Sequence, residues 1–149
     1  MEKQGIVIIM QININEYINK LVEKHQDIKS IWLIGSRANG TEKEDSDWDL
    51  LVFATEETLH SLKNNKEFCK DEIDLLVVYN GNDFQEPWTR DSRNNKCKSG
   101  NLKEWSWKKF TCIEAQYTID AGFKEALRAG VTEWTPREEI LKAQKLWPN

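Results

Sequence analysis

Three short apolar segments constrain the fold of this chain more than any other feature. Residues 49–54 and 73–79 are almost continuous runs of apolar side chains, and residues 28–34 are rich in β-branched residues and end at Gly35. Short apolar runs of this kind, bounded by turn residues, are typical of strands that are covered on both faces. The sequence therefore predicts a small buried β-sheet.

Two segments have the patterning of helices. Residues 13–25 carry apolar side chains at helical spacing, with Asn13 or Asn15 near the start, and residues 56–65 suit a short helix. The first half of the chain is then expected to run α-β-β-α-β. This order predicts the α/β (α+β) class, with a small mixed β-sheet flanked by helices.

The second half of the chain is less regular. Residues 80–82 and 89–101 are polar and indicate a turn and a loop, while broken alternation over 105–119 indicates one or two further strands. Two glycines enclose a short helix predicted over residues 123–129.

The C-terminal segment carries a helix-start signal. Thr135-Pro136-Arg137-Glu138 matches a capping box with proline at the first helical position. Ile140, Leu141, Gln144 and Lys145 then continue a pattern that predicts a final helix, which ends at Pro148.

Length and charge narrow the class of protein. A chain of 149 residues corresponds to one domain, and 39% hydrophobic residues supply a real core. The formal charge of −4 argues against a protein that coats duplex nucleic acid or an anionic membrane. Three cysteines without CxxC spacing indicate neither a disulfide framework nor a zinc site, and the N-terminal apolar run is too short for a signal peptide or a membrane span. We expect a cytoplasmic protein without a membrane partner.

The stretch from Gly35 to Leu50 carries the chemistry. Gly35 follows a predicted strand, so the backbone can turn sharply there, and the N–H groups of Gly35 to Arg37, with the Ser36 hydroxyl, would cradle a phosphate. Asp47 and Asp49 are spaced to project from one face of a strand. A pair of like charges at that distance is tolerated when a divalent cation lies between them, and oxygen ligands favour Mg²⁺ or Mn²⁺. The alternative is a solvated acidic turn.

A third carboxylate is placed in a buried strand. Asp74 interrupts an apolar run, where a carboxylate is costly unless it is paired, hydrogen-bonded or metal-bound. If this strand lies beside the one that starts at Asp49, three carboxylates converge, as in a two-metal phosphoryl-transfer site. Asp71 and Glu72 are rival candidates, but they precede the apolar run and are expected to be solvated.

The composite pattern resembles a known signature. Gly35-Ser36-Arg37-Ala38, then Gly40, five residues, and Ser46-Asp47-Trp48-Asp49-Leu50 resemble the motif of the DNA polymerase beta-like nucleotidyltransferase superfamily, and within it the minimal nucleotidyltransferases. The resemblance implies a nucleotidyltransferase-like fold with its core over residues 13–80. Residues 81–149 are not recognised and are expected to pack on that core as an extension of a single domain, 1–149.

The resemblance also implies roles for individual residues. Gly35 and Ser36 would bind the nucleoside triphosphate, and Arg37 matches a position that is often basic and contacts phosphate, although a surface arginine is an equal alternative. Asp47 and Asp49 would hold the metal ions, with Asp74 as the third metal-site carboxylate, which helps to activate the acceptor hydroxyl.

The sequence departs from the family pattern at two points. Trp48 replaces a small aliphatic residue between the two aspartates, and we expect its side chain to point to the opposite face and pack in the core. The interval from Asp49 to Asp74 is also short for the family, which makes the assignment of Asp74 less direct than that of the pair.

The implied activity is transfer of a nucleoside monophosphate, AMP from ATP, to a hydroxyl acceptor in the presence of Mg²⁺. The acceptor is open among a small molecule, a protein and an RNA. Two other hypotheses stand beside it: an antitoxin-like module that binds a helical partner protein, and a degenerate nucleotide-binding protein. A homodimer is a further expectation for a chain of this size.

A basic island spans residues 86–109, with 7 basic and 3 acidic side chains. It includes Arg90, Arg93, Lys96 and Lys98, interleaved with tryptophans. The island would receive a triphosphate or an RNA acceptor, with indoles stacked on bases. The alternative, which we favour for each single residue, is a solvated loop followed by core-filling tryptophans.

Overall fold

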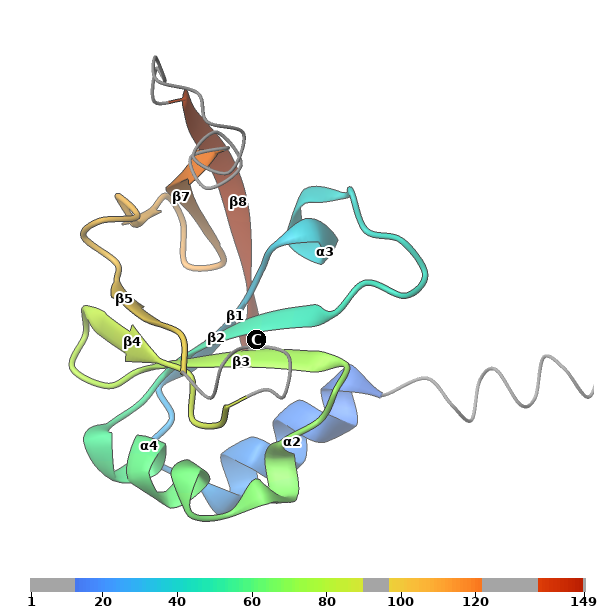
Figure 1. Ribbon diagram of the computed structural model, residues 1–149, viewed down its shortest axis with the longest axis vertical. Helices are drawn as coiled ribbons and strands as arrows, with labels where there is room; N and C mark the ends of the chain where they lie inside the picture. The colour runs from blue at the N-terminus through green and yellow to red at the C-terminus, as the bar shows by residue number, and fades with distance from the viewer. Residues whose placement is uncertain (1–12, 90–96, 122–136, 149) are drawn as a thin grey trace, which may run out of the picture.

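The computed structural model describes residues 13–89, 97–121 and 137–148 (Figure 1). Within these residues the strands form one eight-stranded sheet in the order β5-β4-β3-β2-β1-β8-β7-β6. The sheet is mixed because β2 and β3 are parallel, whereas β1 is antiparallel to both of its neighbours. The α+β class and the mixed sheet predicted from the sequence are confirmed.

The elements agree with the predicted order in the first half of the chain. In chain order they are α2 (Ile14–Lys24), β1 (Ser30–Ile34), α3 (Ser36–Asn39), β2 (Trp48–Phe53), α4 (Glu56–Lys63), the 3₁₀ helix η1 (Lys66–Phe68), β3 (Ile73–Val78), β4 (Asp83–Gln85), β5 (Ser99–Asn101), β6 (Lys108–Lys109), β7 (Glu114–Ala121) and β8 (Arg137–Trp147). The short helix α3 and η1 are additions to the predicted order.

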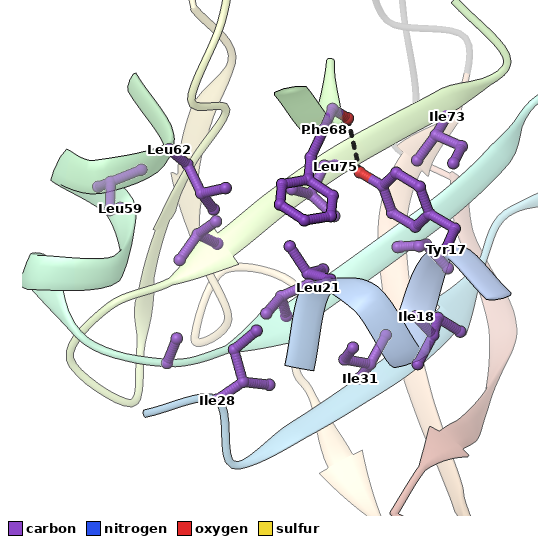
Figure 2. Packing of buried hydrophobic residues seen from close by; sticks show 14 of the residues in the cluster. Tyr17, Ile18, Leu21, Ile28, Ile31, Leu59, Leu62, Phe68, Ile73 and Leu75 are labelled. Carbon is purple, nitrogen blue, oxygen red and sulfur yellow. Dashed lines mark hydrogen bonds between the residues drawn. The ribbon is translucent and has the colours of Figure 1, made fainter. Parts of the chain in front are cut away.

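Helix α2 begins where its sequence provides a cap. The Asn13 side chain accepts a hydrogen bond from the Glu16 N–H at 3.1 Å, which satisfies one of the free donors of the first turn. Tyr17 and Leu21 are buried on the face toward the sheet, and the Tyr17 hydroxyl donates to the Phe68 carbonyl at 2.7 Å (Figure 2). The hydrogen bond ties α2 to the segment that leads into β3.

One face of the sheet is covered by helices. Helices α2 and α4 lie on the same side of β1, β2 and β3 (Figure 1), and their buried side chains meet those of the strands in one apolar cluster (Figure 2). Leu21 from α2, Leu62 from α4, and Leu50 and Leu75 from the strands are almost completely buried in it. This cluster is the main core of the protein.

On the opposite face, the central strands pack against side chains from the second half of the chain. Because side chains alternate along a strand, Trp32, Leu51 and Leu76 point away from the helices and pack in a second cluster with Ala143 of β8 and Tyr117 of β7. Trp105 and Trp107 pack against this cluster. Asp49 and Asp74 have the same parity as Leu51 and Leu76, so both carboxylates belong to this face.

The predicted final helix is wrong, because residues 137–147 form strand β8. This segment pairs with β1 on one side and with β7 on the other. The hydrogen bonds of these two ladders and the burial of Ala143 outweigh the helical preference of the segment. Ile140, one residue of the pattern that predicted the helix, is 66% exposed in the strand.

The loop predicted over residues 89–101 is partly wrong, because its end forms β5. This edge strand pairs with β4, which was not predicted either. Neither strand has an apolar run, but Gly100 lies under the ring of Phe84, where a Cβ would approach Phe84 Cζ to 2.7 Å. The predicted helix over 123–129 lies outside the described residues.

In the part of the chain that the structure describes, no helix is long and apolar enough to cross a membrane.

Candidate active site

Strand register brings the predicted site residues to one edge of the sheet. Ile34, the last residue of β1, is the register partner of Asp49 on the antiparallel strand β2. Asp49 in turn is the register partner of Asp74 on β3, which runs parallel to β2. The turn at Gly35 and the carboxylates of Asp49 and Asp74 therefore come from three adjacent strands, although they are far apart in the sequence.

Gly35 is packed directly against Asp49. Its φ of 76° is in the left-handed region, and a Cβ at this position would lie 2.1 Å from Asp49 Oδ2. Glycine adopts this backbone conformation readily, and it has no Cβ that would clash with Asp49. The turn that starts the candidate phosphate cradle and the carboxylate of the candidate metal ligand are thus in van der Waals contact.

Asp74 is held by a basic residue from the second half of the chain. Its side chain is 17% exposed, and Lys98 Nζ lies 3.3 Å from Asp74 Oδ2. Lys98 is positioned by Glu86, whose buried carboxylate accepts from the Lys98 N–H at 3.3 Å and whose own N–H donates to the Lys98 carbonyl at 2.8 Å. The ion pair offsets part of the cost of placing Asp74 in an apolar strand.

A pocket of about 220 Å³ opens beside these carboxylates. The described residues that line it come from both halves of the chain: Ile34, Gly35, Asp49, Asp74, Leu76, Lys98, Trp105, Tyr117 and Leu141. Three aliphatic and two aromatic side chains form most of the wall, and the charged groups are two carboxylates and one ammonium. The lining therefore combines apolar and charged side chains.

Tyr117 connects the second half of the chain to the Gly35 turn. Its hydroxyl accepts a hydrogen bond from the Gly35 N–H at 2.8 Å, and its ring stacks on Trp105 with a centroid distance of 5.3 Å. Trp105 also contacts the ring of Phe84 at 4.6 Å. This aromatic group fixes the wall of the pocket that faces Asp49 and Asp74.

Asn39 gives the turn a second link to the C-terminal strands. Its side-chain N–H₂ donates to the carbonyls of Gly35 at 2.8 Å and Lys142 at 3.1 Å, and its oxygen accepts from the Lys142 N–H at 2.8 Å. Strand β8 therefore helps to set the geometry of the Gly35 turn.

Arg37 makes contacts within the chain. Its Nη2 donates to the Ser46 carbonyl at 2.9 Å, and its guanidinium carbon lies 4.3 Å from the ring centroid of Trp48. Trp48 is half-buried and packs against the helix-covered cluster, on the face predicted for it. Arg37 thus orders the loop that leads into Asp47, and its contact with a phosphate stays a prediction, as does that of Ser36.

Asp49 and Asp74 have the chemistry of ligands for Mg²⁺ or Mn²⁺. Asp49 and Asp74 are register partners on one pocket wall, and carboxylate oxygens are the donors that these cations prefer. Asp47 is exposed, immediately before β2. Within ranges 13–89, 97–121 and 137–148, no group of three or more His, Cys, Asp or Glu is gathered as a metal site. The two carboxylates are of the donor type that suits a hard cation, and metal binding by Asp47, Asp49 and Asp74 stays a prediction.

The basic island divides between the core and the site. Trp88 is buried, and its indole N–H donates to the Leu62 carbonyl at 2.6 Å, as expected for a packing residue. Lys98 and Trp105, in contrast, line the pocket. Arg90, Arg93 and Lys96 lie outside the described residues.

Sequence reasoning missed the contributions of Asn39 and Tyr117. Tyr117 belongs to a broken alternating pattern that indicated a strand, but nothing local marks it as a partner of Gly35. Lys98 and Trp105 both lie within the basic island of residues 86–109, but its pattern does not indicate that they line a pocket with Asp74. The signal that was missing is long-range register, which a single sequence does not carry.

Comparison with protein families gives one finding. Residues 16–71 match the family model described as polymerase beta, nucleotidyltransferase. The matched range contains the Gly35 turn, Asp47 and Asp49, and ends three residues before Asp74. No curated protein and no solved structure matches the chain.

Proposed function

Since residues 16–71 carry a nucleotidyltransferase domain of the DNA polymerase beta-like superfamily, we propose that the protein transfers a nucleoside monophosphate, AMP from ATP, to a hydroxyl acceptor with Mg²⁺. One observation carries the proposal. The Gly35 turn touches Asp49, and Asp49 is the register partner of Asp74. A phosphate cradle and two carboxylates are thus within reach of one small ligand.

The reaction is a displacement at the α-phosphorus. The acceptor hydroxyl oxygen forms a bond to that phosphorus, and the bond from the phosphorus to the oxygen that bridges to the β-phosphate breaks. Pyrophosphate leaves with the electron pair of the broken bond, and the hydroxyl proton passes to Asp74 and then to water. Most of the rate enhancement in such reactions comes from positioning and charge neutralisation.

Each residue of the site has a defined task in this proposal. The N–H groups that follow Gly35, with the Ser36 hydroxyl, bind phosphate oxygens, and Asp74 accepts the acceptor proton. Asp49 and Asp74, together with Asp47, would hold the cation. When bound, Mg²⁺ neutralises charge on the phosphates and on the leaving pyrophosphate. Tyr117 positions the turn through the Gly35 N–H.

A second function is favoured by the Lys98 contact. The Lys98 ammonium lies 3.3 Å from Asp74 and partly fills the role that a cation would have there. A protein that binds nucleotides without turnover would retain such an ion pair. This alternative predicts ATP binding without transfer.

The two functions are separated by the transfer of label. ATP labelled at the α-phosphate is incubated with Mg²⁺, the protein and a desalted host extract, and the products are sorted into protein, RNA and small molecules. We expect labelling by the wild type and its loss in Asp74→Asn. The matched control is Asp71→Asn, which makes the same change of charge at an exposed position and should label normally.

Two outcomes would contradict the proposal. Equal labelling by wild type and Asp74→Asn would remove Asp74 from the reaction. No labelling in any fraction, with GTP, CTP and UTP also tried, would favour the binding protein without turnover. Metal-dependent ATP binding that is unchanged in Asp47→Asn would show that the assignment of Asp47 is wrong in either case.

A further inference from the structure

The pocket beside Asp49 and Asp74 has walls that the transfer reaction alone does not require. Phosphates and a cation need charged and polar neighbours, but the described lining includes Leu76, Trp105 and Leu141. These side chains come from β3, from the segment between β5 and β6, and from β8, and all three lie outside the residues that match the nucleotidyltransferase family. The apolar wall is thus a feature of this chain's second half.

The volume of the pocket limits what it can hold. At about 220 Å³ it is smaller than the 300–1,000 Å³ that is usual for drug-sized ligands. A cavity of about 150 Å³ with apolar walls holds one benzene ring. The pocket therefore suits a ligand, or the end of a ligand, with a single ring.

The aromatic pair favours a flat group. Trp105 and Tyr117 stack on each other at 28°, and the Tyr117 hydroxyl is engaged by the Gly35 N–H. Tyr117 is 3% exposed, so half-buried Trp105 supplies the aromatic surface on which a further ring gains contact area and favourable ring geometry. The polar end of the same ligand would lie toward Asp74 and Lys98, 3.3 Å from each other.

The position of the carboxylates indicates which substrate enters the pocket. In a nucleoside triphosphate the ribose separates the base from the α-phosphorus, so a base cannot lie against the groups that hold the reacting phosphate. The acceptor hydroxyl, in contrast, must approach that phosphorus directly. A ring that lies between Trp105 and Asp74 therefore belongs to the acceptor.

We infer that this pocket is the acceptor site, and that it takes a hydroxyl group carried on a single ring, with the ring on Trp105 and Leu141 and the hydroxyl toward Asp74. The identification of the bound compound as the acceptor rests on the proposed function. The ligand class follows from the pocket itself. The transfer step is the one described above, with the ring hydroxyl as the oxygen that attacks the α-phosphorus.

Phenol is the probe, and saturation-transfer NMR on the full chain without metal or nucleotide is the measurement. Glycerol serves as a hydroxyl compound without a ring. We expect saturation transfer to phenol and not to glycerol, with phenol binding about two- to twelvefold weaker in Trp105→Ala, since an aromatic pair contributes about 0.5–1.5 kcal/mol. The matched control is Trp107→Ala, because Trp107 is also half-buried but does not line the pocket.

A second pair of variants tests the apolar wall at a residue other than Trp105. Leu141→Asp places a charge on the apolar wall and should weaken phenol binding, whereas Ile140→Asp changes the exposed neighbour on the same strand and should not. Circular dichroism checks that each variant is folded. Transfer of labelled AMP to phenol by the wild type with Mg²⁺ and ATP completes the test.

The outcomes separate this inference from the proposed function. Equal phenol signals in the wild type and in folded Trp105→Ala and Leu141→Asp overturn the inference, even if the extract is labelled. Displacement of phenol by adenosine, with loss of adenosine binding in the same variants, overturns it as well and assigns the pocket to the nucleobase. If phenol binds as expected but no ATP label is transferred, the proposed function fails, and the pocket stands as a site for a one-ring hydroxyl compound.

Discussion

The backbone N–H of Gly35 donates a hydrogen bond to the hydroxyl of Tyr117 at 2.8 Å, across 82 positions of the chain. Gly35 starts the turn of the matched nucleotidyltransferase segment, whereas Tyr117 lies on β7, outside that segment. The second half of the chain thus holds the turn on which phosphate binding is proposed to depend. The geometry of the site is a property of both halves together.

Removal of the Tyr117 hydroxyl should loosen this turn. Tyr117→Phe keeps the ring on Trp105 and deletes the hydrogen bond from the Gly35 N–H, and the loss of that hydrogen bond should lower the free energy of unfolding by about 1 kcal/mol. Because the turn is then less well ordered, the affinity for ATP with Mg²⁺ should also fall. Urea unfolding and calorimetric titration with ATP measure the two effects.

Tyr17→Phe is the matched control for that variant. The Tyr17 hydroxyl donates to the Phe68 carbonyl at 2.7 Å, and burial raises the pKa of this phenol. Its loss should cost a similar free energy of unfolding but leave ATP affinity unchanged, because α2 lies on the other face of the sheet. An equal loss of ATP affinity in both variants would show that the effect of Tyr117 is a general loss of stability.

Because Gly35 contacts Asp49, alanine substitutions at Gly35 and at Gly40 should differ in their effects on stability and activity. Both Gly35 and Gly40 have positive φ, 76° and 71°, but a Cβ at Gly40 has no heavy atom within 4 Å. Gly40→Ala should therefore cost only the left-handed backbone penalty, about 1–2 kcal/mol. Gly35→Ala should lose more stability and also transfer activity, because its Cβ displaces Asp49.

Denaturant unfolding and the label-transfer assay compare the two glycine variants. Equal losses of stability, together with activity retained in Gly35→Ala, would contradict the close packing of Gly35 on Asp49. Activity lost in Gly35→Ala at a protein concentration and temperature where the variant is folded would support it.

The sequence predicted the central strands because their signals are local. Apolar runs that end at turn residues identify β1, β2 and β3, and the carboxylate at Asp74 stands out in such a run without any knowledge of the fold. Asp74 was expected to lie beside Asp49 only if their two strands are neighbours in the sheet. The parallel pairing of β2 and β3 fulfils this condition.

The second half could not be predicted because its structure depends on partners. Residues 137–147 have a helical composition and form β8 only because β1 and β7 supply hydrogen bonds on both sides. A bulge between Ile31 and Trp32 shifts the register of β8, and Leu146 and Trp147 pack against the helix-covered cluster. None of these features is visible in the spacing of apolar residues.

Stability should fall on acidification because of His25. Desolvation by burial, with a smaller contribution from Lys24, lowers the pKa of His25 below its ordinary value of 6.5, while Glu67 acts in the opposite direction. A histidine whose pKa is lowered by folding binds protons more readily when unfolded, so protonation favours the unfolded chain. The free energy of unfolding should then decrease as the pH falls below about 6.5 toward the pKa of the folded state.

Urea unfolding at a series of pH values measures this effect. His25→Gln removes the titrating group, so the decrease between pH 7 and pH 5 should be smaller than in the wild type, while the difference between the two proteins should be constant above about pH 8. A decrease of the same size in both proteins would exclude His25 as its cause.

Lys98 should compete with the cation for Asp74. Its ammonium lies 3.3 Å from Asp74 Oδ2 and is 46% exposed, so the ion pair contributes little to stability and can be displaced. In Lys98→Gln the positive charge is lost, and Mg²⁺ no longer has to displace it from the carboxylate. We expect Mg²⁺ to bind up to about fivefold more tightly in the absence of nucleotide, since an exposed ion pair contributes at most about 1 kcal/mol.

Calorimetric titration of Mg²⁺ into the wild type and the variant measures the difference, with Lys103→Gln as a control for the loss of one exposed positive charge from the same basic island. The control should bind Mg²⁺ as the wild type does, because Lys103 does not line the pocket. Tighter binding in Lys98→Gln alone would place the cation at Asp74. Weaker or unchanged binding in Lys98→Gln would mean that the cation lies elsewhere, and that the ion pair serves to hold Asp74 in its strand.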